Sequence, residues 1–151
     1  MFIRDPAESD DIDRQNATKA GLTYLSLEVA AKSLNRDTLR AFNDLLADAT
    51  KRPLFVYDRY GHLAGGMWYL HLRTVERLDD TAARRRADQL GYRLVNPSEE
   101  QRTFEIAIQR LLSELDSPLP PPPRPAPNGP PPAEPADTNT PPAAEPAADS
   151  K

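Results

Sequence analysis

The chain has 151 residues and a net charge of −4, with basic and acidic residues nearly balanced, so we expect one domain and no nucleic-acid-binding surface. It contains no cysteine, which excludes disulfides, thiolate zinc sites and thiol nucleophiles. Because the sequence has no long apolar run and no signal-peptide pattern, we expect no membrane span and a cytoplasmic protein by default.

The composition changes sharply after Asp116. Residues 117–151 are mainly proline, alanine and scattered acids, with Leu119 as the only large apolar residue. Such a segment buries too little apolar surface to offset its ordering entropy. We therefore predict a folded domain over residues 1–116 and a disordered, partly polyproline-II tail over 117–151. P-x-x-P spacings occur in the tail, as at residues 120–125, but any proline-dense segment produces them by chance.

Strands and helices alternate through the first half of the domain. The predicted elements are a strand at 1–4, a helix at 9–20, a strand at 22–29, a helix that begins at Asn35 or Asp37, and a strand at 54–57. Ser9 is a suitable N-cap for the first helix, and Gly21 supplies its left-handed end. The run Leu54-Phe55-Val56-Tyr57 is continuously apolar, as expected of a central parallel strand that is covered on both faces.

Three helices follow in the second half. The first, at 64–76, is apolar around its whole circumference, which predicts a buried helix. The second is capped by Asp79 or Asp80 and ends at Gly91. The third spans residues 98–116, and its start, Ser98-Glu99-Glu100-Gln101, resembles a capping box. This order of elements predicts an α/β domain with a mostly parallel central sheet.

The segment Pro53–Trp68 has the layout of a phosphate cradle: an apolar strand, a short polar loop and a helix opened by small residues. Such loops hold an anion on backbone N–H groups at a helix start, where the helix dipole favours negative charge. The first loop residue, however, is an acid. The candidate anion loop therefore consists of Asp58, Arg59, Tyr60, Gly61, His62 and Leu63, and Asp58 opposes phosphate binding within it.

The order of elements and several short segments resemble the cysteine-dependent tyrosine and dual-specificity phosphatase superfamily, most closely its small bacterial branch. The matching segments are Arg4–Glu8, Ala20–Leu27, Arg52–Val56 and Gly65–Leu70, within a resemblance that covers Met1 to about Leu115. It implies a three-layer α/β fold with a mostly parallel sheet. Members usually have a strand pair and a helix before the segment that matches Phe2–Arg4, so relative to them the domain lacks N-terminal elements. If Met1 is the true start, we expect an exposed sheet edge; the alternative is a truncated or misassigned start.

The resemblance also implies that the signature loop is degenerate. In the family this loop opens with His and a nucleophilic Cys, contains a Gly and closes with an Arg that grips phosphate through two hydrogen bonds. The corresponding positions are Tyr57, Asp58, Gly61, and Leu63 or Ala64. The loop where the family can carry its general acid reads Ala30-Ala31-Lys32, without a carboxylate. Because nucleophile, clamp and acid are all missing, we expect no catalytic residue, no cofactor and no metal.

Three roles remain open to Asp58. As a nucleophile it would need Mg²⁺ and further acids, and no second carboxylate is close to it in sequence. It could also belong to an altered binding site. As a structural acid it would accept the loop N–H groups in place of an anion and hold the loop shut. The charge argument favours the structural role.

The other candidate residues are favoured as structural. His62 alone has no nucleophile to activate, so we expect a polar loop histidine. His71 lies on the predicted buried helix, and two histidines do not make a metal site. Arg84-Arg85-Arg86, with Arg77 and Arg93, is a candidate basic patch for an acidic partner. Consecutive helical positions point in different directions, which favours a solvated face instead.

Together these features predict a pseudophosphatase, a phosphatase-like domain without hydrolytic chemistry that serves as a binding or regulatory module for a protein partner. One alternative is a phosphoric-ester hydrolase with an unusual site built on Asp58, Arg59 and His62. Another is a domain that anchors an interacting proline-rich tail.

Overall fold

The first strand, β1 (Phe2–Arg4), lies at the centre of a small parallel sheet. The computed structural model describes residues 1–116. β1 pairs with β2 (Ser26–Glu28), with Ile3 opposite Leu27. On its other side a single parallel bridge joins Phe2 to Tyr57, with hydrogen bonds from Ile3 N to Tyr57 O (2.8 Å) and from Tyr57 N to Met1 O (3.1 Å). The parallel arrangement is present, but the sheet has only two short strands and one bridged segment.

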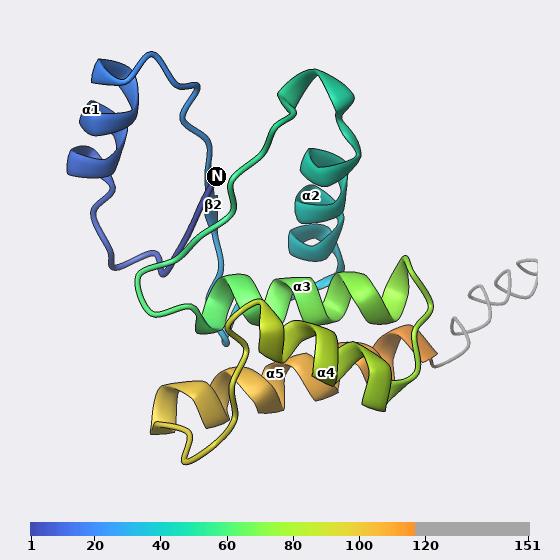
Figure 1. The fold of residues 1–151 in the computed structure, drawn as a ribbon. Helices are drawn as coiled ribbons and strands as arrows, with labels where there is room; N and C mark the ends of the chain where they lie inside the picture. The colour runs from blue at the N-terminus through green and yellow to red at the C-terminus, as the bar shows by residue number, and fades with distance from the viewer. Residues whose placement is uncertain (117–151) are drawn as a thin grey trace, which may run out of the picture. The chain divides into compact units, whose positions relative to one another are not determined.

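The described part of the chain is mixed α/β and mainly helical. Its helices are α1 (Asp11–Lys19), α2 (Arg36–Ala47), the 3₁₀ helix η1 (Ala49–Lys51), α3 (His62–Thr74), α4 (Asp80–Gln89) and α5 (Glu99–Asp116). Figure 1 shows α3 between two groups of elements, with β1 and α2 on one side and α4 and α5 on the other. None of the helices in residues 1–116 has the length and apolar composition needed to cross a membrane.

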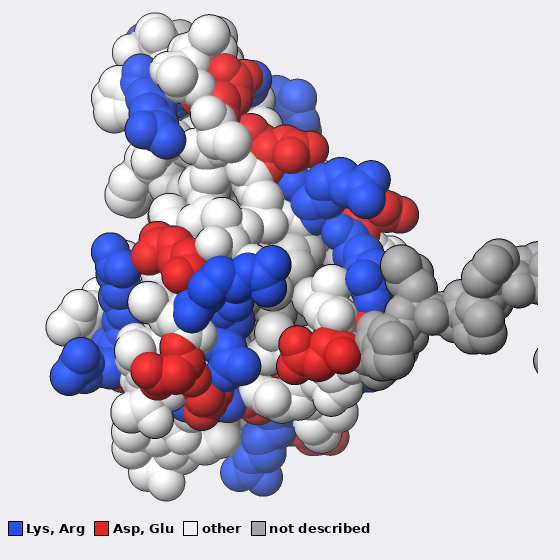
Figure 2. Space-filling model, turned by 90° about the vertical axis from the view of Figure 1, so that its right-hand side faces the viewer, with Lys and Arg blue, Asp and Glu red and all other residues white. Residues whose placement is uncertain are grey.

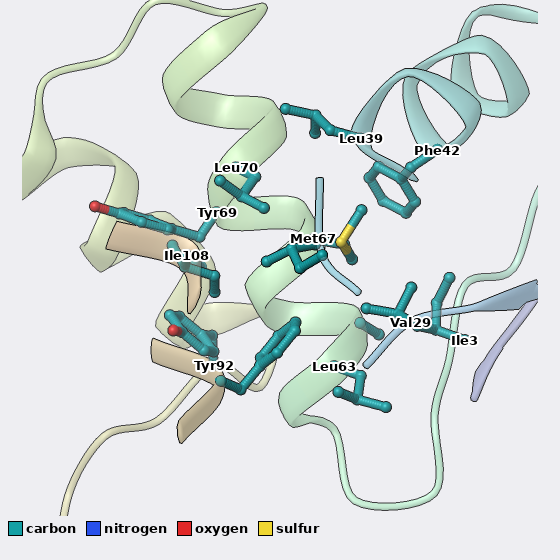
Figure 3. Packing of buried hydrophobic residues seen from close by; sticks show 14 of the residues in the cluster. Ile3, Val29, Leu39, Phe42, Leu63, Met67, Tyr69, Leu70, Tyr92 and Ile108 are labelled. Atoms are coloured by element: carbon teal, nitrogen blue, oxygen red, sulfur yellow. The ribbon is translucent and has the colours of Figure 1, made fainter. Parts of the chain in front are cut away.

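Helix α3 is the centre of the core, as its sequence predicts. Eight of its 13 residues are buried. Figure 3 shows Met67 and Leu70 of α3 between Phe42 of α2 and Ile108 of α5. Close packing on the α5 side depends on the absence of a side chain at Gly66, because a Cβ there would lie 2.6 Å from a ring carbon of Phe104. The apolar surface on all sides of α3 is therefore covered by the elements that surround it.

The caps of α2, α4 and α5 are those predicted from the sequence. The side chain of Asn35 accepts hydrogen bonds from the backbone of Asp37 and Thr38 at the start of α2. At the start of α4, Asp79 accepts one from Ala82 N. The predicted capping box before α5 is confirmed, since Ser98 N donates to the Gln101 side chain and Gln101 N donates to Ser98 Oγ. These caps satisfy backbone donors that have no partner within their own helix.

The strands are shorter than predicted. Only residues 26–28 of the segment 22–29 form a strand, and Leu22 is exposed. The segment 54–57 was expected to be a central strand covered on both faces, and this is wrong: it forms one bridge, and Phe55 is 75% exposed. Its outer side pairs with nothing in residues 1–116, so it lies at an edge of the sheet.

Helix α1 stands apart from the core, as Figure 1 shows. It buries none of its residues, and Ile12 is 74% exposed. Its N-cap is Asp10, whose side chain caps no N–H group of the helix, rather than the predicted Ser9. Asp10 pairs with Arg14 of the same helix at 3.0 Å and with Arg4 of β1 at 3.8 Å, and the second ion pair attaches the start of the helix to the sheet. The predicted tail lies outside the described residues.

Candidate functional site

The anion loop joins the bridged segment at Tyr57 to the first turn of α3. It turns on Gly61, the N-cap of α3, whose φ of +82° lies in the left-handed region that favours glycine. Gly61 O accepts the hydrogen bond of Gly65 N at 3.1 Å, which starts the helix. The short turn returns the side chain of Asp58 to the N-terminus of the same helix.

The carboxylate of Asp58 accepts hydrogen bonds from two backbone donors at the start of α3. One oxygen, Oδ2, accepts from Leu63 N at 3.1 Å, and the other, Oδ1, accepts from Ala64 N at 3.3 Å. These two donors belong to the first turn of α3, where backbone N–H groups have no partner within the helix. The Asp58 side chain is 2% exposed. This is the hydrogen bonding expected of a structural acid, and the helix dipole adds to its stabilisation.

His62 lies beside Asp58 without activating it. Its Nδ1 atom is 3.9 Å from Asp58 Oδ2, which is too long for a hydrogen bond. His62 was predicted as a polar loop residue, but it is the first residue of α3 and its side chain is only 12% exposed. It packs between the rings of Tyr60, at 6.3 Å between centroids, and Phe104, at 6.2 Å. The ring of Phe104 shields the side chain of His62 from solvent.

The other positions that were compared with a phosphatase signature loop, Tyr57, Leu63 and Ala64, also make structural contacts. Tyr57 stacks on Phe2 at 5.1 Å and on Phe55 at 5.4 Å, and its hydroxyl donates to Asp13 at 3.3 Å. Burial and the nearby Asp13 carboxylate raise the pKa of Tyr57. Leu63 and Ala64, the two residues predicted as candidates for the position of an arginine clamp, are both buried in the core. No charged clamp therefore faces the loop from these two positions.

The loop forms one wall of a cleft of about 900 Å³, which we call the loop cleft. Its lining comes from four separate segments of the chain. They are residues 5 and 8 after β1, residues 30–31 after β2, the anion loop and first turn of α3 within 58–63, and the start of α5 within 98–104. Figure 1 shows the beginnings of α3 and α5 on the same side of the molecule. Ala30 and Ala31, from the segment predicted to lack a general acid, face this cleft.

Sequence reasoning missed four acids of the loop cleft. They are Asp5, Glu8, Glu99 and Glu100, which join Asp58 in the lining. Against these five carboxylates stands one guanidinium, that of Arg59, which pairs with Glu8 at 3.6 Å. The four acids come from two segments about 90 residues apart in the chain, so no local spacing signals their association. Only the fold brings them together.

His71 is a packed residue, as predicted. Its Nδ1 atom lies 2.8 Å from Asn43 Oδ1, and the rings of Trp68 and Phe42 meet it edge-on. Burial lowers the pKa of His71, and the carboxylate of Glu76, 3.9 Å from Nε2, opposes that shift. No group of three or more His, Asp or Glu side chains in residues 1–116 is arranged to hold a metal ion.

In the arginine run on α4, Arg84 and Arg86 form ion pairs, while Arg85 and Arg86 are exposed, so the run lies on a solvated face of mixed charge. Arg84 donates to Glu105 at 2.7 Å and to Asp80 at 3.1 Å, and its guanidinium lies 4.9 Å from the ring centre of Tyr69. Arg86 donates to Glu76 at 2.8 Å. Figure 2 shows the same mixture on one face of the molecule, where Lys and Arg alternate with Asp and Glu. The electrostatic potential of that face therefore has no single sign over a large area.

Comparison of the chain with protein-family models, with curated proteins and with solved structures found no match. The assignment of a role to the loop cleft therefore depends on the residues that line it.

Proposed function

We propose that residues 1–116 form a phosphatase-like domain that does not hydrolyse phosphate esters and serves as a binding or regulatory module. The observation that carries this proposal is the position of Asp58. Its two carboxylate oxygens accept the hydrogen bonds of Leu63 N and Ala64 N, the donors that would otherwise hold an anion. The cradle is therefore occupied by a residue of the chain itself.

The proposal includes the three-layer phosphatase-like fold. In its support, the segment before the loop lies parallel to β1 and next to it, and β1 lies next to β2. The helix that follows the loop is the buried helix of the core.

A hydrolase built on Asp58, Arg59 and His62 is disfavoured by the charges of the loop cleft. Both oxygens of Asp58 are engaged, and Arg59 is paired with Glu8. A phosphate dianion would also enter a cleft lined by five carboxylates. Two like charges 4 Å apart repel by about 1 kcal/mol at the dielectric constant of water and by about 4 kcal/mol at the lower effective value near a protein surface. For a substrate of charge −2 this repulsion is a large cost.

The first test is an assay with p-nitrophenyl phosphate, with and without Mg²⁺, on the full chain and on the variant Asp58→Asn. We expect no turnover above the buffer rate from either protein. Turnover by the full chain that disappears in the folded variant would overturn the proposal, because it would make Asp58 catalytic.

A second test uses the absence of cysteine from the chain. In the variant Asp58→Cys the only thiol would lie where Leu63 N and Ala64 N converge. Donors and a helix N-terminus stabilise a thiolate, so we expect its pKa, followed by absorbance at 240 nm, to fall below the usual value of about 8.5. Ser33→Cys, on an exposed residue, is the matched control. A thiol pKa at position 58 equal to or above that of the control would contradict a phosphatase-like cradle.

A further inference from the structure

The loop cleft carries negative charge that no neighbouring cation neutralises. The side chains of Glu99 and Glu100 are exposed, and no hydrogen bond or ion pair from residues 1–116 reaches their carboxylates. Arg59, the one guanidinium in the lining, is already paired with Glu8. Because concave walls of low dielectric constant concentrate the field of the charges that line them, the cleft attracts cations and repels anions.

Aromatic rings lie in the same cleft. Tyr60 is 71% exposed and stacks on His62 with 23° between the two planes, and Phe104 meets His62 edge-on at 82°. An exposed tyrosine ring on an acidic wall offers a flat surface for a cation, with its negative face toward the ligand. The guanidinium of Arg84 over Tyr69 shows the same contact elsewhere in the fold, at 4.9 Å.

These two features together point to one ligand chemistry. A planar guanidinium can stack on a ring while it donates two parallel hydrogen bonds to a carboxylate, which an ammonium cannot do. The cleft of about 900 Å³ is also larger than one side chain needs and falls in the range that holds ligands of several groups. A short peptide therefore fits better than a single ion.

We propose that the loop cleft binds an arginine-containing peptide segment of a partner protein, with the guanidinium on the ring of Tyr60 and between carboxylates of the lining. This inference deepens the proposed function and rests on it, because it requires that the cleft is a binding site and not a site of hydrolysis. Arg59 competes with the incoming arginine for Glu8 and reduces the field of the cleft.

The test is fluorescence anisotropy of the labelled peptide GGRGRGG with the full chain at low and at physiological salt. We expect saturable binding that weakens as salt increases. The same peptide with citrulline in place of arginine should bind at least tenfold more weakly, because citrulline keeps the shape and loses the charge. A lysine peptide should bind severalfold more weakly than the arginine peptide, and free spermidine should compete poorly.

Four variants locate the binding. Glu99→Gln with Glu100→Gln should weaken it about fivefold or more, and Tyr60→Ala should weaken it severalfold. The matched control is Asp37→Asn with Asp44→Asn, which removes the same charge from exposed acids of α2 outside the cleft and should change the affinity less than twofold. Arg59→Gln should strengthen binding, since it removes the competing cation.

Several results would overturn the inference. They are no saturable binding at millimolar peptide, equal binding of the citrulline or lysine peptide, tighter binding of spermidine, or an equal loss of affinity in the α2 control. With no p-nitrophenyl phosphate turnover, such a result would remove only the arginine site and leave the proposed function standing. Turnover that depends on Asp58 would remove the proposed function whatever the peptide does.

Discussion

The backbone of Tyr92 passes directly beside Gly65: a Cβ on this glycine would lie 2.8 Å from Tyr92 N and 2.9 Å from Tyr92 Cα. This approach holds the segment between α4 and α5 against α3. Replacing Gly65 by alanine should therefore lower the free energy of unfolding by ~2–3 kcal/mol, although alanine is the better helix former, because backbone atoms cannot move aside as a side chain can. Urea denaturation measures this loss.

Gly21→Ala provides the comparison for that measurement. Gly21 has a φ of +70°, but no atom lies within 4 Å of the added Cβ. Its cost should be that of the backbone conformation alone, ~1 kcal/mol. An equal or smaller loss at Gly65 would mean that the Tyr92 segment moves freely away from α3.

The carboxylate of Asp58 should contribute measurably to stability. Asp58→Ala leaves Leu63 N and Ala64 N without acceptors beneath a side chain that is 2% exposed. We expect a loss of ~2–3 kcal/mol in the free energy of unfolding, because both donors are left unsatisfied. Asp79→Ala removes an exposed cap with one hydrogen bond at the start of α4 and should cost ~1 kcal/mol. A smaller effect at Asp58 than at Asp79 would contradict the structural role.

The ion pairs of Arg84 predict a sharp contrast between neighbouring residues. Glu105 accepts from Arg84 and from the Tyr92 hydroxyl, so Arg84→Ala leaves a half-buried carboxylate without its charged partner. We expect a loss of ~1.5–3 kcal/mol from that substitution. Arg85→Ala, at an exposed position, should change stability by less than ~0.5 kcal/mol. Thermal denaturation of the two variants measures the difference, and equal effects would mean that the ion pairs of Arg84 do not contribute to stability.

Burial of His71 makes stability depend on pH. Because the pKa of His71 in the folded chain lies below its usual 6.5, the unfolded chain binds the proton more readily. The free energy of unfolding should therefore fall as the pH decreases from 7.5 through 6.5 to 5.5. In His71→Gln this part of the fall should be absent. Asp80 and Glu105 do not contribute to the change between pH 7.5 and 5.5. Their pKa values are lowered, so they take up protons and lose their stabilising interactions only in more acidic solution. Identical pH profiles for both proteins would contradict the assignment.

The sequence predicted the helices and their ends better than the sheet. Caps such as Asn35 and Asp79 act on backbone groups two or three residues away, so the local sequence contains both partners. A strand needs a partner from elsewhere in the chain. The apolar run at 54–57 looked like a covered strand, but Phe55 has no cover in residues 1–116, and no local pattern reports this.

In the candidate site, too, local contacts could be predicted from the sequence and contacts between distant segments could not. The contact of Asp58 with the start of α3 spans six residues, and the predicted loop chemistry anticipated it. The acidity of the loop cleft did not follow from the sequence, because Glu8 and Glu99 line the same cleft only through the packing of α3 and α5. His62 was predicted to be a polar loop residue because its local sequence gives no sign of burial. The ring of Phe104, which packs against it, lies 42 residues farther along the chain.

Helix α1 has a consequence for how the molecule opens. Because it buries none of its residues and contacts the sheet through polar groups such as Asp13 and Asp10, it can open without unpacking α3, α4 and α5. Its amide hydrogens should exchange with solvent through local opening, long before those of the core helices, which exchange only with global unfolding. A protease should accordingly cut first within residues 10–22, and the remaining helices should stay assembled after that cut.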